Sequence, residues 1–440
     1  MAIASYDTAL ASAGVGAFQK RLIAVFGLVW AADAMQVLAI GFTAPSIATS
    51  FGIPVQQALQ TGTALFLGML VGAFLFGGLA DRFGRRPVLI ATVLIDAVFG
   101  LASAFAPNFG WLVALRFLTG LGVGGTLPVD YAMMAEFLPA NRRGRWLVAL
   151  EGFWAIGTVV LALASLAAQG AHPADIWRIL FAATAAPALM GLGLRLLIPE
   201  SPLFLLRHDR TSEANAVLAK IARTNGRSGG APNLLEATRP LATSTSAGSI
   251  FGPDLRRRSA LILAVWLLVS ASYYGVFVWL PVRLAEQGFG FLRGEAFLVL
   301  VALAQLPGYA LAAYGVERWG RRPTLVAFLL LSASGCFAFG VGSSVGLLAT
   351  ATLLMSFALL GTWGALYAFT PELYPTELRA TGMGSAGAMA RLGGLLAPTV
   401  LAPVIASGFG LALCSFAALL VLAAVLTLTI DVETKRMPLK

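Results

Sequence analysis

The sequence predicts an all-α membrane protein of twelve transmembrane helices, arranged as two pseudo-symmetric six-helix bundles. Three observations support this class. The 440 residues are 58% hydrophobic and only 11% charged, whereas a soluble domain carries about 25% charged residues. Apolar runs long enough to cross about 30 Å of hydrocarbon recur along the whole chain. A basic motif in the first half of the chain also returns in the second half.

The repeated motif fixes the relation between the two halves. Asp81-Arg-Phe-Gly-Arg-Arg-Pro87 recurs 236 positions later as Glu317-Arg-Trp-Gly-Arg-Arg-Pro323. The same offset relates four further pairs, Trp30 and Trp266, Glu136 and Glu372, Pro139 and Pro375, and Arg143 and Arg379. A motif repeated at a fixed distance inside an apolar chain indicates two copies of one membrane unit.

The apolar runs indicate helices, because only helices or closed barrels satisfy the backbone in lipid. The twelve expected spans cover residues 22–48, 58–80, 88–106, 110–134, 144–168, 176–197, 259–284, 295–316, 323–341, 346–369, 378–405 and 409–430. Glycines 120, 122, 124 and 125 form a smooth stripe that should let neighbouring helices approach closely.

The spans define three regions. We expect an N-terminal six-helix bundle over residues 1–198 and a C-terminal six-helix bundle over residues 259–440. Residues 199–258 form the one long polar segment, with an amphipathic pattern from Ser212 to Arg223. This segment predicts a cytoplasmic linker with short amphipathic helices followed by a flexible stretch.

Basic residues predict the orientation and the compartment. Loops after the even-numbered spans carry arginines, and loops after spans 1, 3, 9 and 11 carry essentially none. Both termini are therefore expected in the cytoplasm of a multi-pass plasma-membrane protein. No cleavable signal peptide is evident from Met1 to Lys20. Cys336 and Cys414 both fall in apolar runs, so we expect no disulfide.

Several motifs resemble the major facilitator superfamily over essentially the whole chain. Gly77-Gly-Leu-Ala-Asp-Arg-Phe-Gly-Arg-Arg-Pro87 resembles its gating-loop motif, and Arg116-Phe-Leu-Thr-Gly-Leu-Gly-Val-Gly-Gly125 resembles its fourth-helix motif. Pro371-Glu-Leu-Tyr-Pro-Thr-Glu-Leu-Arg-Ala-Thr-Gly382 and Trp30-Ala-Ala-Asp-Ala-Met-Gln36 resemble the organic-ion and synaptic-vesicle-protein-like branch. That branch includes bacterial niacin permeases and aromatic-acid carriers.

The resemblance to sugar porters is weaker at the expected binding site. Pro199-Glu-Ser-Pro202 and Glu433-Thr-Lys435 are similar to motifs of that group and its relatives. Span 7, however, contains Ser270-Ala-Ser-Tyr-Tyr-Gly275, and span 5 contains Glu151-Gly-Phe-Trp-Ala-Ile-Gly157. Both segments lack the glutamines that sugar porters use for sugar hydroxyls.

The repeat separates the charges of the chain into two sets. Charges present in both halves are expected to serve the architecture. Charges present in only one half are expected to bind the substrate or the coupled ion. The first set lies at the expected cytoplasmic helix ends and is interpreted as an ion-pair latch for the inner gate, although simple topology marking is the alternative. Its members are Asp81, Arg85, Arg86, Glu136, Arg143, Glu317, Arg321, Arg322, Glu372 and Arg379.

The second set is costly in a membrane, since a charge at the bilayer centre costs about 2.5–3.5 kcal/mol. It comprises Asp33, Asp96, Arg116, Asp130, Glu151 and Arg391, and none of their repeat positions keeps a charge. The family resemblance implies that Asp33 and Arg116 form a proton-sensing pair, with a permanent structural ion pair as the alternative. Glu151 is the third proton-coupling candidate, and otherwise an inner-gate partner for arginine.

Arg391 in span 11 is expected to decide the sign of the substrate. Organic-anion carriers of the resembled branch place an arginine here, and its planar fork suits a carboxylate. Pairing with Glu151 or Asp33 inside the protein is the alternative. The remaining substrate-binding candidates are Gln305 for hydrogen bonding and, for ring stacking, Trp154, Tyr273, Tyr274, Trp363 and Tyr367. For each of them, ordinary helix packing without ligand contact is the alternative.

These features predict a proton-coupled secondary transporter that imports a small organic anion by rocker-switch alternating access. Nicotinate (niacin) is the first choice, and a benzoate-type aromatic acid, an organic cation, a sugar or drug export are the alternatives. The expected partners are the organic anion, protons and the lipid bilayer, with no nucleic acid and with a monomeric protein. No cofactor or metal is expected. The sequence shows no nucleophile–base pair and no metal-ligand cluster, which argues against an enzyme. It also shows no phosphate-binding motif, which argues against ATP-driven transport.

Overall fold

The computed structural model describes residues 6–139, 143–227, 249–286, 295–400 and 409–435, and these fold into helices joined by short turns. The first bundle and its N-terminal extension contain α1 (Tyr6–Ala13), α2 (Ala17–Phe51), α3 (Val55–Ala58), α4 (Gln60–Phe83), α5 (Arg85–Ser103), α6 (Phe109–Glu136), α7 (Arg143–Glu151), α8 (Phe153–Ala167) and α9 (Ile176–Arg195). Between the bundles lie α10 (Pro202–Arg207) and α11 (Thr211–Thr224). The second bundle contains α12 (Arg256–Glu286), α14 (Glu295–Arg318), α15 (Arg321–Val341), α16 (Val345–Phe369), α17 (Thr376–Val400) and α19 (Phe409–Leu428).

The predicted all-helical membrane class is confirmed. Among the described residues, ten helical segments are long and apolar enough to cross a membrane, and α7 together with α8 counts as one of them. The helices α14 and α17, which take the places of predicted spans 8 and 11, are 24 and 25 residues long. At 1.5 Å per residue, each exceeds the roughly 30 Å of a hydrocarbon core.

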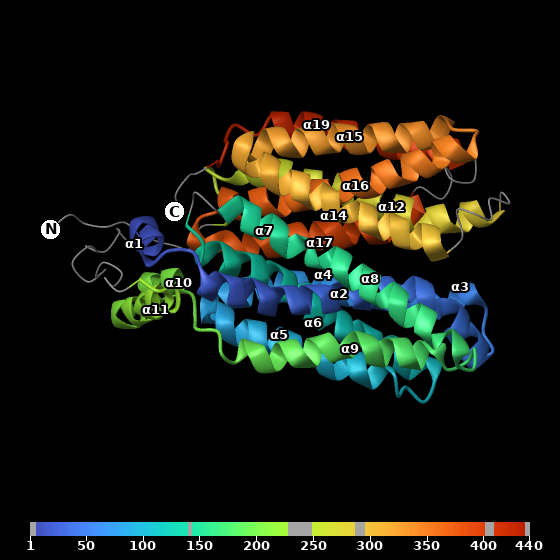
Figure 1. Cartoon of the computed structure of the whole chain (residues 1–440), viewed down its shortest axis with the longest axis horizontal. Helices are drawn as coiled ribbons and strands as arrows, with labels where there is room; N and C mark the ends of the chain where they lie inside the picture. The colour runs from blue at the N-terminus through green and yellow to red at the C-terminus, as the bar shows by residue number, and fades with distance from the viewer. Residues whose placement is uncertain (1–5, 140–142, 228–248, 287–294, 401–408, 436–440) are drawn as a thin grey trace.

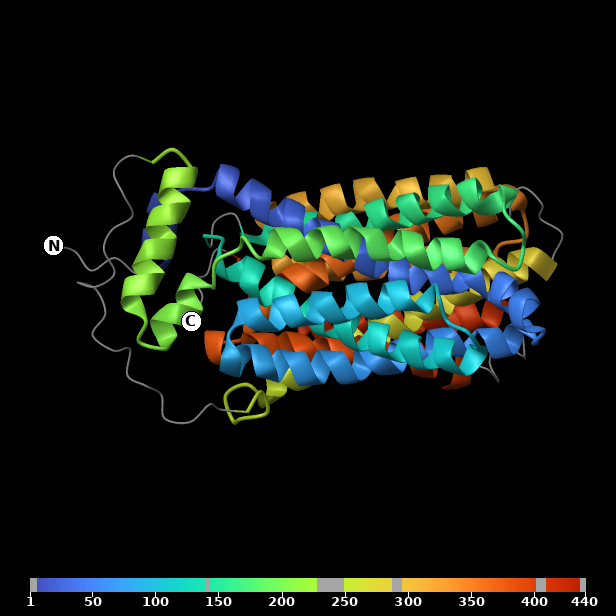
Figure 2. The same ribbon diagram turned by 90° about the horizontal axis from the view of Figure 1, so that it is seen from below.

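The two bundles lie side by side with their helices nearly parallel, the first blue to green and the second yellow to red (Figure 1). The described chain starts and finishes at one end of this assembly, where α10 and α11 also lie. Figure 2 shows α11 lying across that end, nearly perpendicular to the long helices. We call this end, which carries Arg85, Arg143, Arg321 and Arg379, the basic end.

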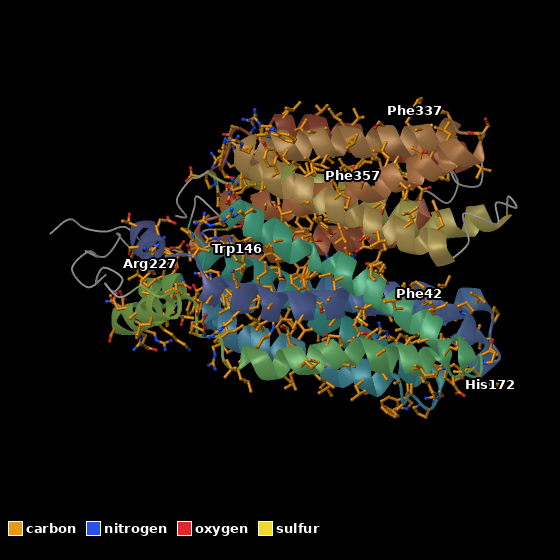
Figure 3. All side chains as sticks on the ribbon, viewed as in Figure 1. Phe42, Trp146, His172, Arg227, Phe337 and Phe357 are labelled. Atoms are coloured by element: carbon orange, nitrogen blue, oxygen red, sulfur yellow. The ribbon has the colours of Figure 1, made fainter. Side chains whose placement is uncertain are left out.

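The outer flanks of both bundles are apolar, as contact with lipid requires. Phe337 stands on the outer flank of the second bundle with 55% of its surface exposed (Figure 3). Phe42 of the first bundle is 36% exposed. Nitrogen-rich side chains instead gather around the basic end, near Arg227, in the same view. This separation of apolar flanks from a charged end matches the pattern that the sequence predicts.

The repeated motif forms the same turn in both bundles. Gly84 separates α4 from α5 with φ of 107°, and Gly320 separates α14 from α15 with φ of 112°. Only glycine adopts this backbone region without strain. The motif therefore specifies a tight turn between two antiparallel membrane helices, once in each half.

The predicted glycine stripe brings α6 against α4. A Cβ atom at Gly120 or Gly124 would lie 2.1 Å from the carbonyl oxygen of Leu65 or Met69, respectively. No side chain fits at that distance, so these positions require glycine. The expected close approach of the helices is confirmed.

The segment between the bundles holds the short helices α10 and α11, the latter where the amphipathic pattern predicts a helix. The apolar face of α11 buries Leu218 and Ile221. Asn225, just after α11, donates hydrogen bonds to the carbonyl oxygens of Ala13 and Gly14 at 3.3 and 2.7 Å. The segment is thus attached to the end of α1. The Gly, Ser and Thr-rich residues 228–248 lie outside the described residues.

Candidate substrate cavity and gate

A cavity lies between the two bundles, within the membrane-spanning part of the helices. It holds about 300 Å³ of space that no protein atom fills, partly open to solvent, and both bundles line it. Its lining residues come from α7, α8, α12, α16 and α17 and are Glu151, Trp154, Tyr273, Tyr274, Leu360, Trp363, Tyr367 and Arg391. Every substrate-binding candidate except Gln305 is among them. Gln305 is buried in α14 away from this lining.

Arg391 enters the cavity from α17 with 2% of its surface exposed. Nη1 donates a long hydrogen bond of 3.5 Å to the carbonyl oxygen of Gly387, and Nε has no partner among the described residues. The alternative pairing inside the protein is not formed here, because no described carboxylate lies within 4.0 Å of the guanidinium, neither that of Glu151 nor that of Asp33. A buried cation without a counter-charge is costly, so this position favours an incoming anion.

Glu151 lies on the α7 side of the cavity with 3% of its surface exposed. Its Oε2 accepts a hydrogen bond of 2.5 Å from the hydroxyl of Tyr131, and its Oε1 accepts a long one of 3.4 Å from the hydroxyl of Tyr309. Among the described residues it forms no ion pair within 4.0 Å. The expectation that Glu151 serves as an inner-gate partner for arginine is wrong for this structure, because two tyrosines hold it instead.

Aromatic side chains close the cavity towards the basic end. Tyr131 and Tyr367, 236 positions apart, stack across the two bundles with ring centroids 4.3 Å apart. Trp30 packs edge-on against both tyrosines at 5.1 and 5.5 Å, and Trp266 packs edge-on against Tyr367 at 4.7 Å. Tyr131 lies on α6 five residues before the gate residue Glu136. These rings therefore separate the cavity from the ion pairs of the basic end.

The pair Tyr131 and Tyr309 was missed by the sequence reasoning. The repeat offset that relates Trp30 to Trp266 also relates Tyr131 to Tyr367 and was the available signal for Tyr131. No such signal exists for Tyr309, because its role depends on the approach of α14 to α7. Only the folded arrangement brings its hydroxyl to Glu151.

The expected pairing of Asp33 with Arg116 is not formed. Arg116 donates hydrogen bonds of 2.7 and 2.8 Å to the side-chain and backbone oxygens of Gln36. Its guanidinium also lies 4.4 Å from the ring centroid of Phe181. Gln36, one turn after Asp33 on α2, takes the place that the acid was expected to fill. The family-based pairing missed this because amide and backbone oxygens also accept hydrogen bonds from a guanidinium.

Asp33 is fully buried in the first bundle, and neither carboxylate oxygen has a hydrogen-bond partner among the described residues. Asp96 is buried in the same unpartnered way. Asp130, which belongs to the charges present in one half only, forms a fully buried ion pair of 2.6 Å with Arg195 of α9. An isolated ionised carboxylate is strongly disfavoured in such surroundings. Protonation of Asp33 is the simplest way to relieve that cost.

Each bundle carries the same ion-pair arrangement at the basic end. In the first bundle, Arg85 contacts Asp81 at 3.0 Å and Glu136 at 3.2 Å. In the second, the corresponding Arg321 contacts Glu317 at 3.8 Å and Glu372 at 3.0 Å. Both arginines are almost completely buried.

Two further ion pairs join the bundles. Glu136 of α6 contacts Arg379 of α17 at 2.9 Å, and both are fully buried. Arg143 of α7 contacts Glu372 of the second bundle at 3.8 Å.

The acids of the repeated motif complete this junction by binding backbone N–H groups of the opposite bundle. Asp81 accepts hydrogen bonds from the backbone N–H and the hydroxyl of Thr381, both at 2.7 Å. Glu317 accepts one of 3.0 Å from the backbone N–H of Arg145. Both donors lie near the N-terminal ends of their helices, Thr381 in α17 and Arg145 in α7, where the helix dipole favours negative charge. Ion pairs and hydrogen bonds between described residues of the two bundles therefore hold the bundles together at the basic end.

Arg86 and Arg322 differ from the other gating candidates, because their described contacts stay within their own half. Arg86 donates to the carbonyl oxygen of Ile198, just after α9, at 2.8 Å. Arg322 donates to the carbonyl oxygen of Ile430, just after α19, at 2.7 Å. Both satisfy carbonyls at helix C-termini, a common role for arginine. Their assignment to a latch between the bundles is corrected accordingly.

The sugar-porter-like motifs anchor the linker and the C-terminal segment to these turns. Glu200 accepts hydrogen bonds from the backbone N–H groups of Arg85 and Arg86 at 3.1 Å each. Glu433 does the same for Arg321 and Arg322 at 2.9 and 3.0 Å. Each acid thereby satisfies free N–H donors at the start of a helix. Burial raises the pKa of Glu200, and the N–H groups of Ser201 and Arg86 oppose that rise.

The N-terminal helix α1 adds a contact that the sequence reasoning missed. The hydroxyl of Tyr6 donates a hydrogen bond of 2.5 Å to the backbone oxygen of Glu136. Asp7 forms an ion pair of 3.2 Å with Arg143. The helix therefore rests on the same two residues that join the bundles, and it supports the closed arrangement of the basic end.

Comparisons with known proteins agree with this architecture. The family model for sugar (and other) transporters matches residues 21–440. A solved proton:xylose symporter of the major facilitator superfamily, bound to 6-bromo-6-deoxy-D-glucose, superposes with a TM-score of 0.81 at 21% sequence identity, covering 96% of this chain and 98% of that one. The fold and the cavity between two bundles define a multi-pass membrane carrier of the major facilitator fold.

Two relatives of known sequence show which transporters this chain resembles. The chain is 36% identical over 426 residues to the niacin transporter of Acinetobacter baylyi, covering 96% of this chain and 95% of the relative. It is 34% identical over 424 residues to a candidate niacin/nicotinamide transporter of Bacillus subtilis, covering 96% of this chain and 98% of the relative. The chain belongs to the sugar (and other) transporter family. The predicted resemblance to bacterial niacin permeases is confirmed, and a family of transporters agrees with the expectation that the chain is not an enzyme.

Proposed function

We propose that this protein is a secondary transporter that imports nicotinate together with protons by rocker-switch alternating access. Arg391 is the observation that carries the proposal. Its guanidinium lines a cavity between two bundles, is 2% exposed and has no carboxylate partner within 4.0 Å among the described residues. A monocarboxylate supplies the missing counter-charge through two parallel hydrogen bonds. The niacin activity in the names of both relatives supports the same substrate.

The aromatic lining favours a flat ring over the alternatives. Trp154, Tyr273 and Trp363 surround the cavity, and rings of this kind stack on an aromatic acid. A sugar needs several amide and carboxylate groups for its hydroxyls, and the lining offers one acid and one arginine. An organic cation lacks a group for Arg391 and adds like charge beside it.

The transport cycle follows from the closed basic end. We place this end in the cytoplasm of the plasma membrane, because its arginines follow the positive-inside rule, and the protein works as a monomer. The present arrangement, locked by Glu136–Arg379 and Arg143–Glu372, excludes the cytoplasm from the cavity. Substrate then enters from the opposite side, and rupture of these pairs with separation of Tyr131 from Tyr367 releases it inward.

Binding tests the substrate assignment directly. Nicotinate at 100 times its dissociation constant stabilises the folded protein by about 2.7 kcal/mol, so the melting temperature of the detergent-purified protein should rise. Nicotinamide, choline and xylose at the same concentration should raise it much less, because none carries a carboxylate. Stabilisation by nicotinamide or choline without nicotinate would refute the anion assignment.

Asp33 is the proposed proton-coupling group, since its buried carboxylate lacks hydrogen-bond partners among the described residues. Asp33→Asn keeps the shape and removes the titration. We expect the variant to lose nicotinate accumulation driven by an imposed pH gradient in proteoliposomes, by roughly tenfold or more. Exchange of labelled for unlabelled nicotinate at equal pH should persist.

The exposed Asp254 of the linker provides the matched control. Asp254→Asn should leave both accumulation and exchange unchanged. If Asp33→Asn retains full accumulation under the pH gradient, Asp33 has no part in coupling.

A further inference from the structure

The cavity contains a second charged group whose function Arg391 does not explain. Glu151 occurs in one half of the repeat only, and its counterpart in the other half is Gly387. The carboxylate belongs to the cavity lining and not to the ion pairs of the basic end. An acid buried in the membrane is energetically costly, and one that is absent from the other half of the repeat is expected to have a specific function.

The hydrogen-bond inventory of Glu151 leaves capacity on one oxygen. A carboxylate offers about four acceptor positions. Tyr131 occupies Oε2 at 2.5 Å, while from the described part of the chain Oε1 accepts only a long hydrogen bond of 3.4 Å from Tyr309. No described cation lies within 4.0 Å, and the residue lines the cavity. The free capacity of Oε1 is therefore available to a ligand in the cavity.

The arrangement of the cavity restricts which part of a ligand meets Glu151. Arg391 belongs to α17 of the second bundle, and Glu151 belongs to α7 of the first. Aromatic side chains from both bundles, among them Trp154 and Trp363, complete the lining. A flat acid whose carboxylate binds Arg391 presents the far edge of its ring to the first bundle. The group recognised by Glu151 is thus a polar atom of the ring itself.

We propose that Glu151 recognises a ring nitrogen, so that the substrate class is the azaaromatic monocarboxylates and not the benzoates. This inference rests on the proposed function. The ring nitrogen and the carboxyl of Glu151 form one hydrogen bond around a single shared proton, whichever of the two holds it. The hydroxyl of Tyr131 fixes the carboxyl in place. A benzoate, which carries only C–H at that position, leaves Oε1 without a partner in a desolvated site.

Binding of four ligands to the unmodified protein distinguishes recognition of the carboxylate from recognition of the ring nitrogen. Nicotinate and nicotinamide carry the ring nitrogen, whereas benzoate and benzamide do not; nicotinate and benzoate carry the carboxylate. By equilibrium binding to the purified full-length protein, nicotinate should bind roughly tenfold or more tightly than benzoate, because one hydrogen bond to a charged group is lost. Nicotinamide should exceed benzamide by a similar factor.

The variant Glu151→Met assigns the effect to the residue. Methionine keeps the length and removes both oxygens, so the preference for nicotinate over benzoate should disappear, and benzoate should bind no more weakly than to the unmodified protein. Retained benzoate binding also shows that the variant is folded. The control Glu213→Gln, at an exposed linker position, should leave all four affinities unchanged.

The outcomes distinguish the inference from the proposed function. Equal and measurable binding of nicotinate and benzoate to the unmodified protein overturns the role of Glu151 and leaves the anion carrier intact. The same follows if Glu151→Met folds and keeps the preference for nicotinate. Absence of binding by both acids overturns the proposed function itself. If Glu151→Met does not fold, the four-ligand comparison in the unmodified protein still decides the substrate class.

Discussion

Replacing Arg391 with alanine should lower nicotinate affinity at least about 100-fold and abolish nicotinate uptake at micromolar concentrations. Truncating one partner of a buried, hydrogen-bonded charge pair costs about 2–5 kcal/mol, and 100-fold corresponds to about 2.7 kcal/mol. The loss is large because the substrate carboxylate would then be buried without a cation. Binding of labelled nicotinate to the purified variant measures it.

Folding should survive this substitution, which makes the result interpretable. Arg391 has no ion-pair partner within 4.0 Å among the described residues, so its removal leaves no protein carboxylate without its cation. The melting temperature without substrate should stay the same or rise. Arg391→Lys keeps the charge but loses the planar fork, so its affinity for nicotinate should lie between those of the unmodified protein and Arg391→Ala. Undiminished nicotinate binding by Arg391→Ala would remove the arginine from the substrate site.

The second large effect is expected at the gate. Glu136 contacts both Arg85 and Arg379, and all three are almost completely buried. Glu136→Gln removes the negative charge that both arginines share. Breaking a buried ion pair by removing one partner costs about 3–5 kcal/mol. The loss of the contact with Arg379, which joins the two bundles, falls only on the conformation in which the basic end is closed. The equilibrium should shift roughly 100-fold or more towards opening at that end.

Spin labels report this shift in distance. Phe83 and Trp319 are exposed at the basic end, one in each bundle, and are related by the repeat. With cysteines introduced there in a background without Cys336 and Cys414, pulsed electron paramagnetic resonance should show longer distances in Glu136→Gln than in the parent.

The control for the gate is an ion pair outside it. Arg210 and Glu213 form an exposed pair on the linker surface, so Glu213→Gln should leave the distance distribution unchanged. If Glu136→Gln also leaves the distribution at its parental value, the ion pairs at the basic end do not hold the gate closed.

Much of the fold could be predicted because it follows from local and repeated signals. Apolar runs define the helices, and the offset between Asp81 and Glu317 identifies the two bundles. The turn glycines at positions 84 and 320 are part of the repeated motif itself. The lining residues Trp154 and Arg391 could be proposed because helix position and family resemblance place their spans around the central cavity.

The partners of the charged residues could not be predicted in the same way. A buried charge accepts any complementary group within reach, and which group that is depends on how the helices rotate and pack. Arg116 therefore bonds Gln36 instead of Asp33, and Asp130 pairs with Arg195 from a helix far along the chain. Tyr309 reaches Glu151 only because α14 packs beside α7. Such contacts are set by the tertiary structure and leave no periodic signal.

Accumulation of labelled nicotinate in proteoliposomes containing the purified protein tests the central claim most directly. An imposed pH gradient, acidic on the side opposite the basic end, should concentrate nicotinate above its equilibrium level. A protonophore should abolish the accumulation, and excess unlabelled nicotinate should compete more strongly than nicotinamide. If folded protein carries no nicotinate in this assay, or only lets it equilibrate without response to the gradient, the account of a proton-coupled nicotinate carrier is contradicted.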